Sequence, residues 1–480
     1  MKNQLKRLFG DTIIYGLSGV ISSLISIFLI PLYTRVFQPA DYGVIALLTT
    51  TSVLLNILLI FSLDNSASVL FWDKEDEKER KITFNSWFWF LIFVGLAASL
   101  IIIASSKLLS LLFFSSDRYT LLFVLLGGNL FFVGFQKVLN IWCRMLQRPV
   151  QAMLFSLAIL LLTVVFNVLF ILVWKVGVMG VFLSQLIASA VGFLIMVITF
   201  QRWISFKHFS GLRLREMIKL SASLVPATVL YWLMNTASVY FLKMHGKDNA
   251  EIGLYQVGAS VANVLSLATW AFFQAWSPFA LSVSKQTNAK DIYRFVFELY
   301  CVGGFFIAFS LMLMGRDILT FFTHPDYLGA STVLGLLAIN VILLGTPSIL
   351  AIANNLVKQN TPYAIAISLG SAITVILFLL LIPGYGKEGA AVSMIIGNLA
   401  VPLYLVFKTQ KLYHVPYNFV RIILVVMIQL IFFIAAYRLT ESPVTRSAFV
   451  ILMGLLIVSL YYFRNSGIFI HALFKKRNGK

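Results

Sequence analysis

The chain has 480 residues, of which 60% are hydrophobic and only 11% are charged. A soluble globular protein carries about 25% charged residues, so this composition argues strongly against a water-soluble enzyme. A bilayer-spanning helix needs about 20 mostly apolar residues, and fourteen such helices would use nearly the whole apolar supply. The composition therefore predicts an all-α polytopic membrane protein with short loops.

The formal net charge is +19, which in a soluble protein would suggest a nucleic-acid partner. Here the basic residues stand between apolar runs, so the membrane explains them and no nucleic-acid partner is expected. The two cysteines, Cys143 and Cys301, show no CxxC spacing. Neither a disulfide framework nor a metal site is predicted from them.

Hydropathy predicts fourteen membrane spans in chain order. The first follows Lys2, Lys6 and Arg7 and has no small-residue cleavage site, so we interpret it as an uncleaved helix rather than a signal peptide. Pro226 and Asn235 interrupt the seventh span. The predicted spans cover 12–33, 42–63, 84–104, 119–141, 152–174, 178–200, 217–240, 252–276, 295–315, 327–348, 362–382, 389–407, 419–437 and 447–463.

The distribution of basic residues orients these spans. With both ends of the chain in the cytoplasm, the cytoplasmic loops and tails collect 27 of the 37 lysines and arginines. A missed or invented span would exchange the two sides downstream and blur this bias, so fourteen spans is the favoured topology. The cluster Lys475–Arg477 fits a cytoplasmic tail near anionic lipid headgroups.

No segment offers catalytic machinery. The longest loop, 64–83, contains the mixed-charge run Asp73–Arg80, which we interpret as a solvated helical extension, with a partner-docking site as the alternative. The sequence has no HExxH, GxSxG or phosphate-binding glycine loop, and the five histidines lie in loops or at span ends. The chain is therefore expected to be neither an enzyme nor a cofactor-dependent protein.

The sequence aligns with itself at an offset near 210 residues. Ala40–Gly43 (ADYG) falls on Ala250–Gly253 (AEIG), and Gly177 and Gly180 fall on Gly386 and Gly389 near the end of the repeat. Each copy of the repeat is six spans long. Because six is an even number, the two copies have the same orientation in the membrane. Two parallel bundles with a cleft between them are the architecture of a transporter that works by alternating access.

The repeat predicts three regions. Residues 1–208 form an N-terminal six-helix lobe, and residues 209–410 form a C-terminal six-helix lobe. Residues 411–480 hold two extra transmembrane helices and the basic cytoplasmic tail.

Polar residues inside spans are the candidates for function, because ionisable groups are costly in a membrane. Asp64 ends the second span and corresponds to Gln274 in the eighth, so each is either a helix-end residue or part of the cleft lining. Lys137 lies inside the fourth span, and Arg144 lies just beyond the end of this span. Lys137 either extends to the inner headgroups or faces the cleft.

Four further charged residues complete the candidates. Glu298 lies about one turn from Arg294, so it either pairs with this arginine or titrates as a carboxylate coupled to transport. Lys243 and Lys285 flank the seventh and eighth spans and are either membrane anchors or cleft cations. Lys137, Arg144, Lys243 and Lys285 are the candidates for binding an anionic substrate.

Several short motifs resemble one known family. Leu29–Arg35 (LIPLYTR), followed by Ala40–Gly43, resembles the N-terminal signature of the polysaccharide transporters, and Ala250–Tyr255 (AEIGLY) repeats that pattern. Gln274–Pro278 (QAWSP) and Gly177–Gly180 (GVMG) resemble other positions of the family. These transporters are the O-antigen and exopolysaccharide repeat-unit flippases of the MOP exporter superfamily.

The resemblance implies a MATE-like fold of two six-helix lobes in the bacterial cytoplasmic membrane. It implies translocation of an undecaprenyl-diphosphate-linked oligosaccharide to the outer leaflet, with a polysaccharide polymerase or chain-length regulator as a possible partner. The related lipid II flippases have cations in their first span, and this sequence has none between Thr12 and Tyr33. The alternatives are a drug or small-metabolite exporter of the same superfamily, usually with twelve spans, and a membrane scaffold for polysaccharide assembly.

Overall fold

The structure, a computed structural model, describes residues 29–73, 76–352, 361–440 and 442–474. Every regular element in these ranges is helical. Ten helical stretches of the described residues are long and apolar enough to cross a membrane, and the pair α9–α10, bent by 46°, makes an eleventh if it is one span. The prediction of an all-α polytopic membrane protein is therefore confirmed.

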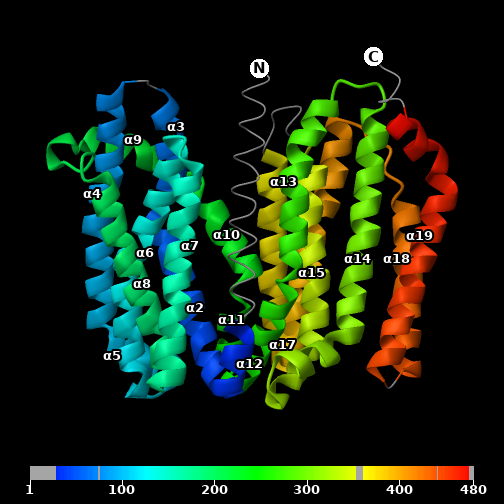
Figure 1. Cartoon of the computed structure of the whole chain (residues 1–480), viewed down its shortest axis with the longest axis horizontal. Coiled ribbons are helices and arrows are strands. Elements are labelled where there is room, and N and C mark those ends of the chain that lie inside the picture. The colour runs from blue at the N-terminus through cyan, green and yellow to red at the C-terminus, as the bar shows by residue number, and fades with distance from the viewer. Residues whose placement is uncertain (1–28, 74–75, 353–360, 441, 475–480) are drawn as a thin grey trace.

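The N-terminal half is a bundle around two apolar cores (Figure 1). Short helical turns η1 (Asp117–Tyr119) and η2 (Leu169–Val173) extend its helices. The bundle consists of α2 (Pro39–Ile60), α3 (Leu63–Asp73), α4 (Glu77–Ala104), α5 (Ser106–Phe114), α6 (Thr120–Met145), α7 (Pro149–Val168) and α8 (Val178–Phe200).

The C-terminal half forms a second bundle beside the first (Figure 1). It consists of α10 (Val225–Asn235), α11 (Ser238–Met244), α12 (Asn249–Ala262), α13 (Leu265–Val283), α14 (Ala289–Phe322), η4 (Pro325–Ala330), α15 (Ser331–Leu350) and α17 (Thr361–Leu412). In α17 the backbone leaves the helical conformation at Gly386, with φ at 51°. Gly370, before this break, lies against Gly397 after it, so α17 is two antiparallel arms that match the predicted spans 362–382 and 389–407.

Two helices lie outside the paired bundles, at the far edge of the C-terminal half (Figure 1). These helices are α18 (Phe419–Leu439) and α19 (Pro443–Phe474). The Gln429 side chain of α18 donates a hydrogen bond of 3.1 Å to the carbonyl of Val302 in α14. Arg446 of α19 binds Asp317 of α14 at 2.9 Å. Polar contacts of this kind fix helices to one another in a membrane, where apolar contact alone does not select a partner.

The described structure differs from the predicted spans in two places. The seventh span is broken into α9 (Gly211–Ala222) and α10, and the predicted N-terminal span 12–33 lies mostly outside the described residues. In addition α9 packs against α3 and α4 of the N-terminal half, together with the turn η3 (Phe206–His208). Fourteen spans and the boundary at residue 208 therefore remain predictions.

The two halves meet through α2 and α12, which the sequence repeat places in equivalent positions. A Cβ atom on Gly43 would overlap the carbonyl oxygen of Asn249, and one on Gly253 would overlap that of Pro39. Gly43 and Gly253 are 210 residues apart, as are Pro39 and Asn249, so the contact follows the internal repeat. Only glycine permits such a close approach of two backbones.

The contact lies at one end of the molecule, with α5 and α11, whereas α3 and α9 lie at the other end (Figure 1). We call these the α5–α12 end and the α3–α9 end. The Tyr327 hydroxyl of η4 reinforces the contact by donating to the buried carbonyl of Phe37 at 2.8 Å. The halves are thus joined at the end that the basic residues predict to be outside.

Alanine at Gly43 or Gly253 should separate α2 from α12. Overpacking costs about 1–3 kcal/mol, so backbone amides of both helices should exchange with deuterium about 5-fold to 150-fold faster. Mass spectrometry of the detergent-solubilised protein measures this exchange. Gly303→Ala is the matched control because a Cβ there meets open space. Equal exchange in Gly253→Ala and Gly303→Ala would contradict the contact.

Candidate functional site: a polar cavity between the two halves

Three adjoining cavities lie beside α2 and α12. The N-half cavity, of about 450 Å³, is enclosed by α2, α6, α7, α8 and α10. The junction cavity, of about 420 Å³, shares Thr49 and Gln185 with it. The C-half cavity, of about 480 Å³, shares Asn263 and Ser266 with the junction cavity. The three adjoining cavities thus extend from the N-terminal half to the C-terminal half.

The positions of the lining residues along the helices show where the three cavities lie. Thr49, Ser52 and Asn56 follow Gly43 in α2, one helical turn or so apart, and so share one face. Gln256 and Ser260 follow Gly253 in α12 in the same way. The cavities are therefore on the α3–α9 side of the glycine contact, and the contact closes them toward the α5–α12 end.

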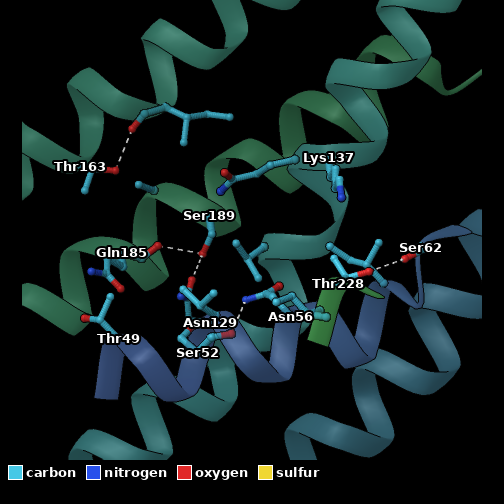
Figure 2. Close-up of a pocket in the computed structure, with 17 residues that line it drawn as sticks. Thr49, Ser52, Asn56, Ser62, Asn129, Lys137, Thr163, Gln185, Ser189 and Thr228 are labelled. Atoms are coloured by element: carbon cyan, nitrogen blue, oxygen red, sulfur yellow. Dashed lines mark hydrogen bonds between the residues drawn. The ribbon is translucent and has the colours of Figure 1, made fainter. Parts of the chain in front are cut away.

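Ten of the 17 described residues that line the N-half cavity carry uncharged hydrogen-bonding side chains, and six are apolar (Figure 2). Ser189 of α8 donates to Asn129 of α6 at 2.5 Å, which joins these two helices across the cavity wall. Asn56 donates its amide NH₂ to the carbonyl of Ser52 at 2.9 Å, but its Oδ1 is buried and has no partner in the described structure. A buried acceptor without a partner is costly, and because the Asn56 side chain lines the cavity, its rotation would present this oxygen to an O–H or N–H of a bound molecule.

One charged residue, Lys137 of α6, lines the cavities among the residues the structure describes. Its Nζ lies 2.8 Å from Oδ2 of Asp64 in α3, and the two side chains are 44% and 14% exposed, respectively. Oδ1 of Asp64 is buried and has no hydrogen-bond partner in the described residues. Two sequence candidates are therefore brought together, and each neutralises the other's charge.

The N-half cavity ends at a break between α2 and α3. Phe61 and Ser62 both have positive φ, 51° and 54°, which is unfavourable for residues other than glycine. The Ser62 carbonyl accepts a hydrogen bond from Ser221 of α9 at 2.9 Å, and its hydroxyl lies 3.4 Å from that of Thr228 in α10 (Figure 2). The strained break is thereby tied to the bend where the chain passes from one half to the other.

The other three predicted cations do not line the described cavities. Lys243, in α11, donates to Asn249 at 2.9 Å beside the glycine contact. Arg144, near the end of α6, and Lys285, in the turn after α13, are exposed. The expected cluster of four cations is therefore not assembled around the cavity in this structure.

The remaining candidates lie in the C-terminal half. Glu298 of α14 is buried and pairs with Arg421 of α18 at 2.9 Å, so it connects the appended helices to the bundle. Arg294 is 3.3 Å from Asp291. Gln274 of α13 is half-buried and is not among the residues that line the three cavities.

Sequence reasoning missed most of the lining. The spacing of Thr49, Ser52 and Asn56 at three and four residues is a helical polar stripe that could have indicated a cavity face. Gln185 and Ser189, four residues apart in α8, form a shorter stripe of the same kind, and Gln136 directly precedes Lys137.

Two helical bundles that meet through α2 and α12 beside polar cavities have a MATE-like architecture. The solved structure titled "Lipid II flippase MurJ, inward closed conformation" is similar over 94% of this chain and 99% of that chain, with a TM-score of 0.76 and 17% identity. An inward-facing MATE family multidrug resistance transporter of the MOP superfamily is similar over 82% of this chain and 95% of that chain, with a TM-score of 0.65 and 15% identity. At these identities the likeness establishes the fold.

A family model described as "polysaccharide biosynthesis protein" matches residues 32–282, just over half of the chain. The chain belongs to this polysaccharide biosynthesis family. No curated protein sequence matches the chain. The family predicted from the motifs Leu29–Arg35 and Ala40–Gly43 is thus confirmed, and the described helices make the chain a multi-pass membrane protein.

Removing one partner of the Lys137–Asp64 pair should cost more than removing both. A double-mutant cycle with Lys137→Met and Asp64→Asn, read by thermal unfolding in detergent, should give a coupling free energy of about 1 kcal/mol. The exposed pair Lys81–Glu77 is the control, with a coupling near zero. Equal coupling in the two pairs would show that the cavity pair is not formed.

Proposed function

We propose that this protein is a flippase for undecaprenyl-diphosphate-linked oligosaccharide repeat units, which it moves from the cytoplasmic to the outer leaflet by alternating access. The observation that carries the proposal is the set of adjoining cavities, because ten of the 17 described residues that line the N-half cavity carry uncharged amides or hydroxyls. A saccharide presents many O–H donors, and the Asn56 Oδ1 acceptor has no other partner in the described residues. The family's description supports the same substrate class.

The cavity lowers the cost of moving the polar head. Each charge at the bilayer centre costs at least about 2.5–3.5 kcal/mol, and unpaired hydroxyls add to that cost. Amide and hydroxyl groups of the lining replace the water lost by the sugars, while the prenyl chain stays in lipid. The diphosphate displaces Asp64 from Lys137, so that one ion pair is exchanged for another.

The membrane potential supplies a driving force. With the cytoplasm negative, outward movement of two negative charges is favoured by about 4.6 kcal/mol per 100 mV. Export then needs no bound cofactor. Proton exchange at Asp64 or Glu298 would add to this force, and these two carboxylates are the candidates for such coupling.

We orient the protein in the membrane by the distribution of its basic residues. The α3–α9 end faces the cytoplasm, both termini lie there, and the structure is the state closed to the outside. A polysaccharide polymerase or chain-length regulator in the bacterial inner membrane would receive the product.

A drug or small-metabolite exporter is less well supported. A cationic drug needs an anionic partner, and Asp64, the carboxylate next to the N-half cavity, is already paired with Lys137. A membrane scaffold for polysaccharide assembly would not require polar cavities. If the protein does not move lipid-linked oligosaccharides, the exporter and the scaffold are the functions that remain.

Reconstitution into liposomes tests the proposal. We expect fluorescent undecaprenyl-diphosphate-linked oligosaccharide to change leaflet when the protein is present, and to accumulate on the positive side of an imposed potential. Accessibility of the label in each leaflet measures the movement. No movement with several lipid-linked sugars, for folded protein, would contradict the flippase function.

Lys137→Ala should slow this movement. A charge-assisted hydrogen bond contributes about 1.5–3 kcal/mol, so its loss should reduce the initial rate at least about 10-fold. Lys285→Ala removes the same charge from an exposed turn outside the described cavities and should keep the wild-type rate. Equal rates in the two variants would exclude Lys137 as the diphosphate contact.

A further inference from the structure

The C-half cavity has a composition different from that of the N-half cavity. Two aromatic side chains, Trp270 of α13 and Tyr231 of α10, line it and are 38% and 46% exposed, respectively. Phe273, one turn after Trp270, and the backbone of α15 at Gly345 complete the wall. A Cβ on Gly345 would overlap the ring of Phe273, so this glycine allows the wall to pack closely.

The two exposed rings of the C-half cavity pack against no other aromatic ring in the described residues. Trp270 and Tyr231 have no ring partner within the described residues, whereas Trp276, six residues after Trp270, is buried and stacks on Phe272. An aromatic ring usually packs against another apolar group when it can. Two unpaired faces on one cavity of about 480 Å³ therefore indicate a surface for a ligand.

Polar groups stand next to these rings. The amide of Asn263, the hydroxyls of Ser348 and Tyr231 and the indole N–H of Trp270 all line the same cavity. None of these groups has a hydrogen-bond partner in the part of the chain that the structure describes. Asn263 also lines the junction cavity, so the polar edge of the C-half cavity continues toward the lining of the N-half cavity.

We propose that the C-half cavity is a second saccharide subsite, in which Trp270 stacks on the C–H face of one sugar ring of the lipid-linked oligosaccharide. The inference rests on the proposed function and names which part of the substrate binds where. The face of an aromatic ring is electronegative, and the C–H groups of a sugar ring are electropositive. The hydroxyls of that sugar bind Asn263 and Ser348 at its edge.

This arrangement divides the substrate between the halves. The N-half cavity, with Lys137, takes the diphosphate and the sugars next to it, and the C-half cavity takes a sugar further along the chain. A prenyl chain fits the second cavity less well, because it would leave the Asn263 amide and the Ser348 hydroxyl without partners. The subsite makes transport depend on the sugar as well as on the lipid anchor.

Two probes separate the parts of the substrate: undecaprenyl diphosphate without sugar, and the same lipid carrying a trisaccharide. Binding to the full chain in nanodiscs and movement in liposomes are both measured. Trp270→Ala should weaken binding of the trisaccharide lipid about 10-fold, and leave binding of the sugar-free lipid unchanged. Trp270→Phe, which keeps an aromatic face, should retain most of the affinity.

Two further variants act as controls. Trp174→Ala removes a tryptophan that is 62% exposed and lines none of the three cavities, and it should bind both lipids as the wild type does. Asn263→Leu preserves the size of the side chain and removes its hydrogen bonds. It should weaken the trisaccharide lipid only, whereas a prenyl pocket would bind the sugar-free lipid as well or better.

The outcomes distinguish this inference from the proposed function. Movement by the wild type with no effect of Trp270→Ala on the trisaccharide lipid would overturn the subsite and leave the flippase intact. Equal weakening of both lipids would also overturn it, since the cavity would then hold the lipid anchor. Trp270-dependent binding of the trisaccharide lipid without movement would support the subsite and contradict the flippase. Absence of both binding and movement in the wild type would overturn both.

Discussion

The backbone contact between Gly43 and Gly253 determines how the two halves meet. Because neither residue has a Cβ, α2 and α12 approach more closely there than at any position with a side chain would allow. Further along both helices, Thr49, Asn56 and Gln256 carry polar side chains that cannot face lipid without cost. One contact thus closes the α5–α12 end and leaves the polar faces around a common cavity on its other side.

The chemistry of this cavity depends on the balance between charge and hydrogen bonding. Asp64 neutralises Lys137, so the described lining has no large uncompensated charge to trap an ion. The amides and hydroxyls, some of them without partners in the described residues, offer directional bonds to a molecule that arrives with its own donors. Such a lining suits a polar, largely uncharged oligosaccharide, and the aromatic wall at Trp270 suits the less polar face of a sugar.

Much of the fold was predictable, whereas most of the site was not. The internal repeat already paired Gly43 with Gly253, because duplication preserves sequence spacing. The pairing of Lys137 with Asp64 could not be predicted in this way, because the two residues belong to different spans and hydropathy does not tell which face of a span is turned inward. The position of Trp270 in the C-half cavity could not be predicted for a related reason, since lipid-facing and protein-facing positions of a membrane helix are both apolar. Tertiary packing decides which of these residues meet the cavity.

A structure of the protein in nanodiscs with a bound undecaprenyl-diphosphate-linked oligosaccharide tests the central claim most directly. The account predicts sugar density in the adjoining cavities beside α2, α10 and α12, with the diphosphate near Lys137 and the prenyl chain leaving between the halves. Sugar density confined to the lipid-facing surface, for example along α18 and α19, with the cavities holding only water, would contradict it.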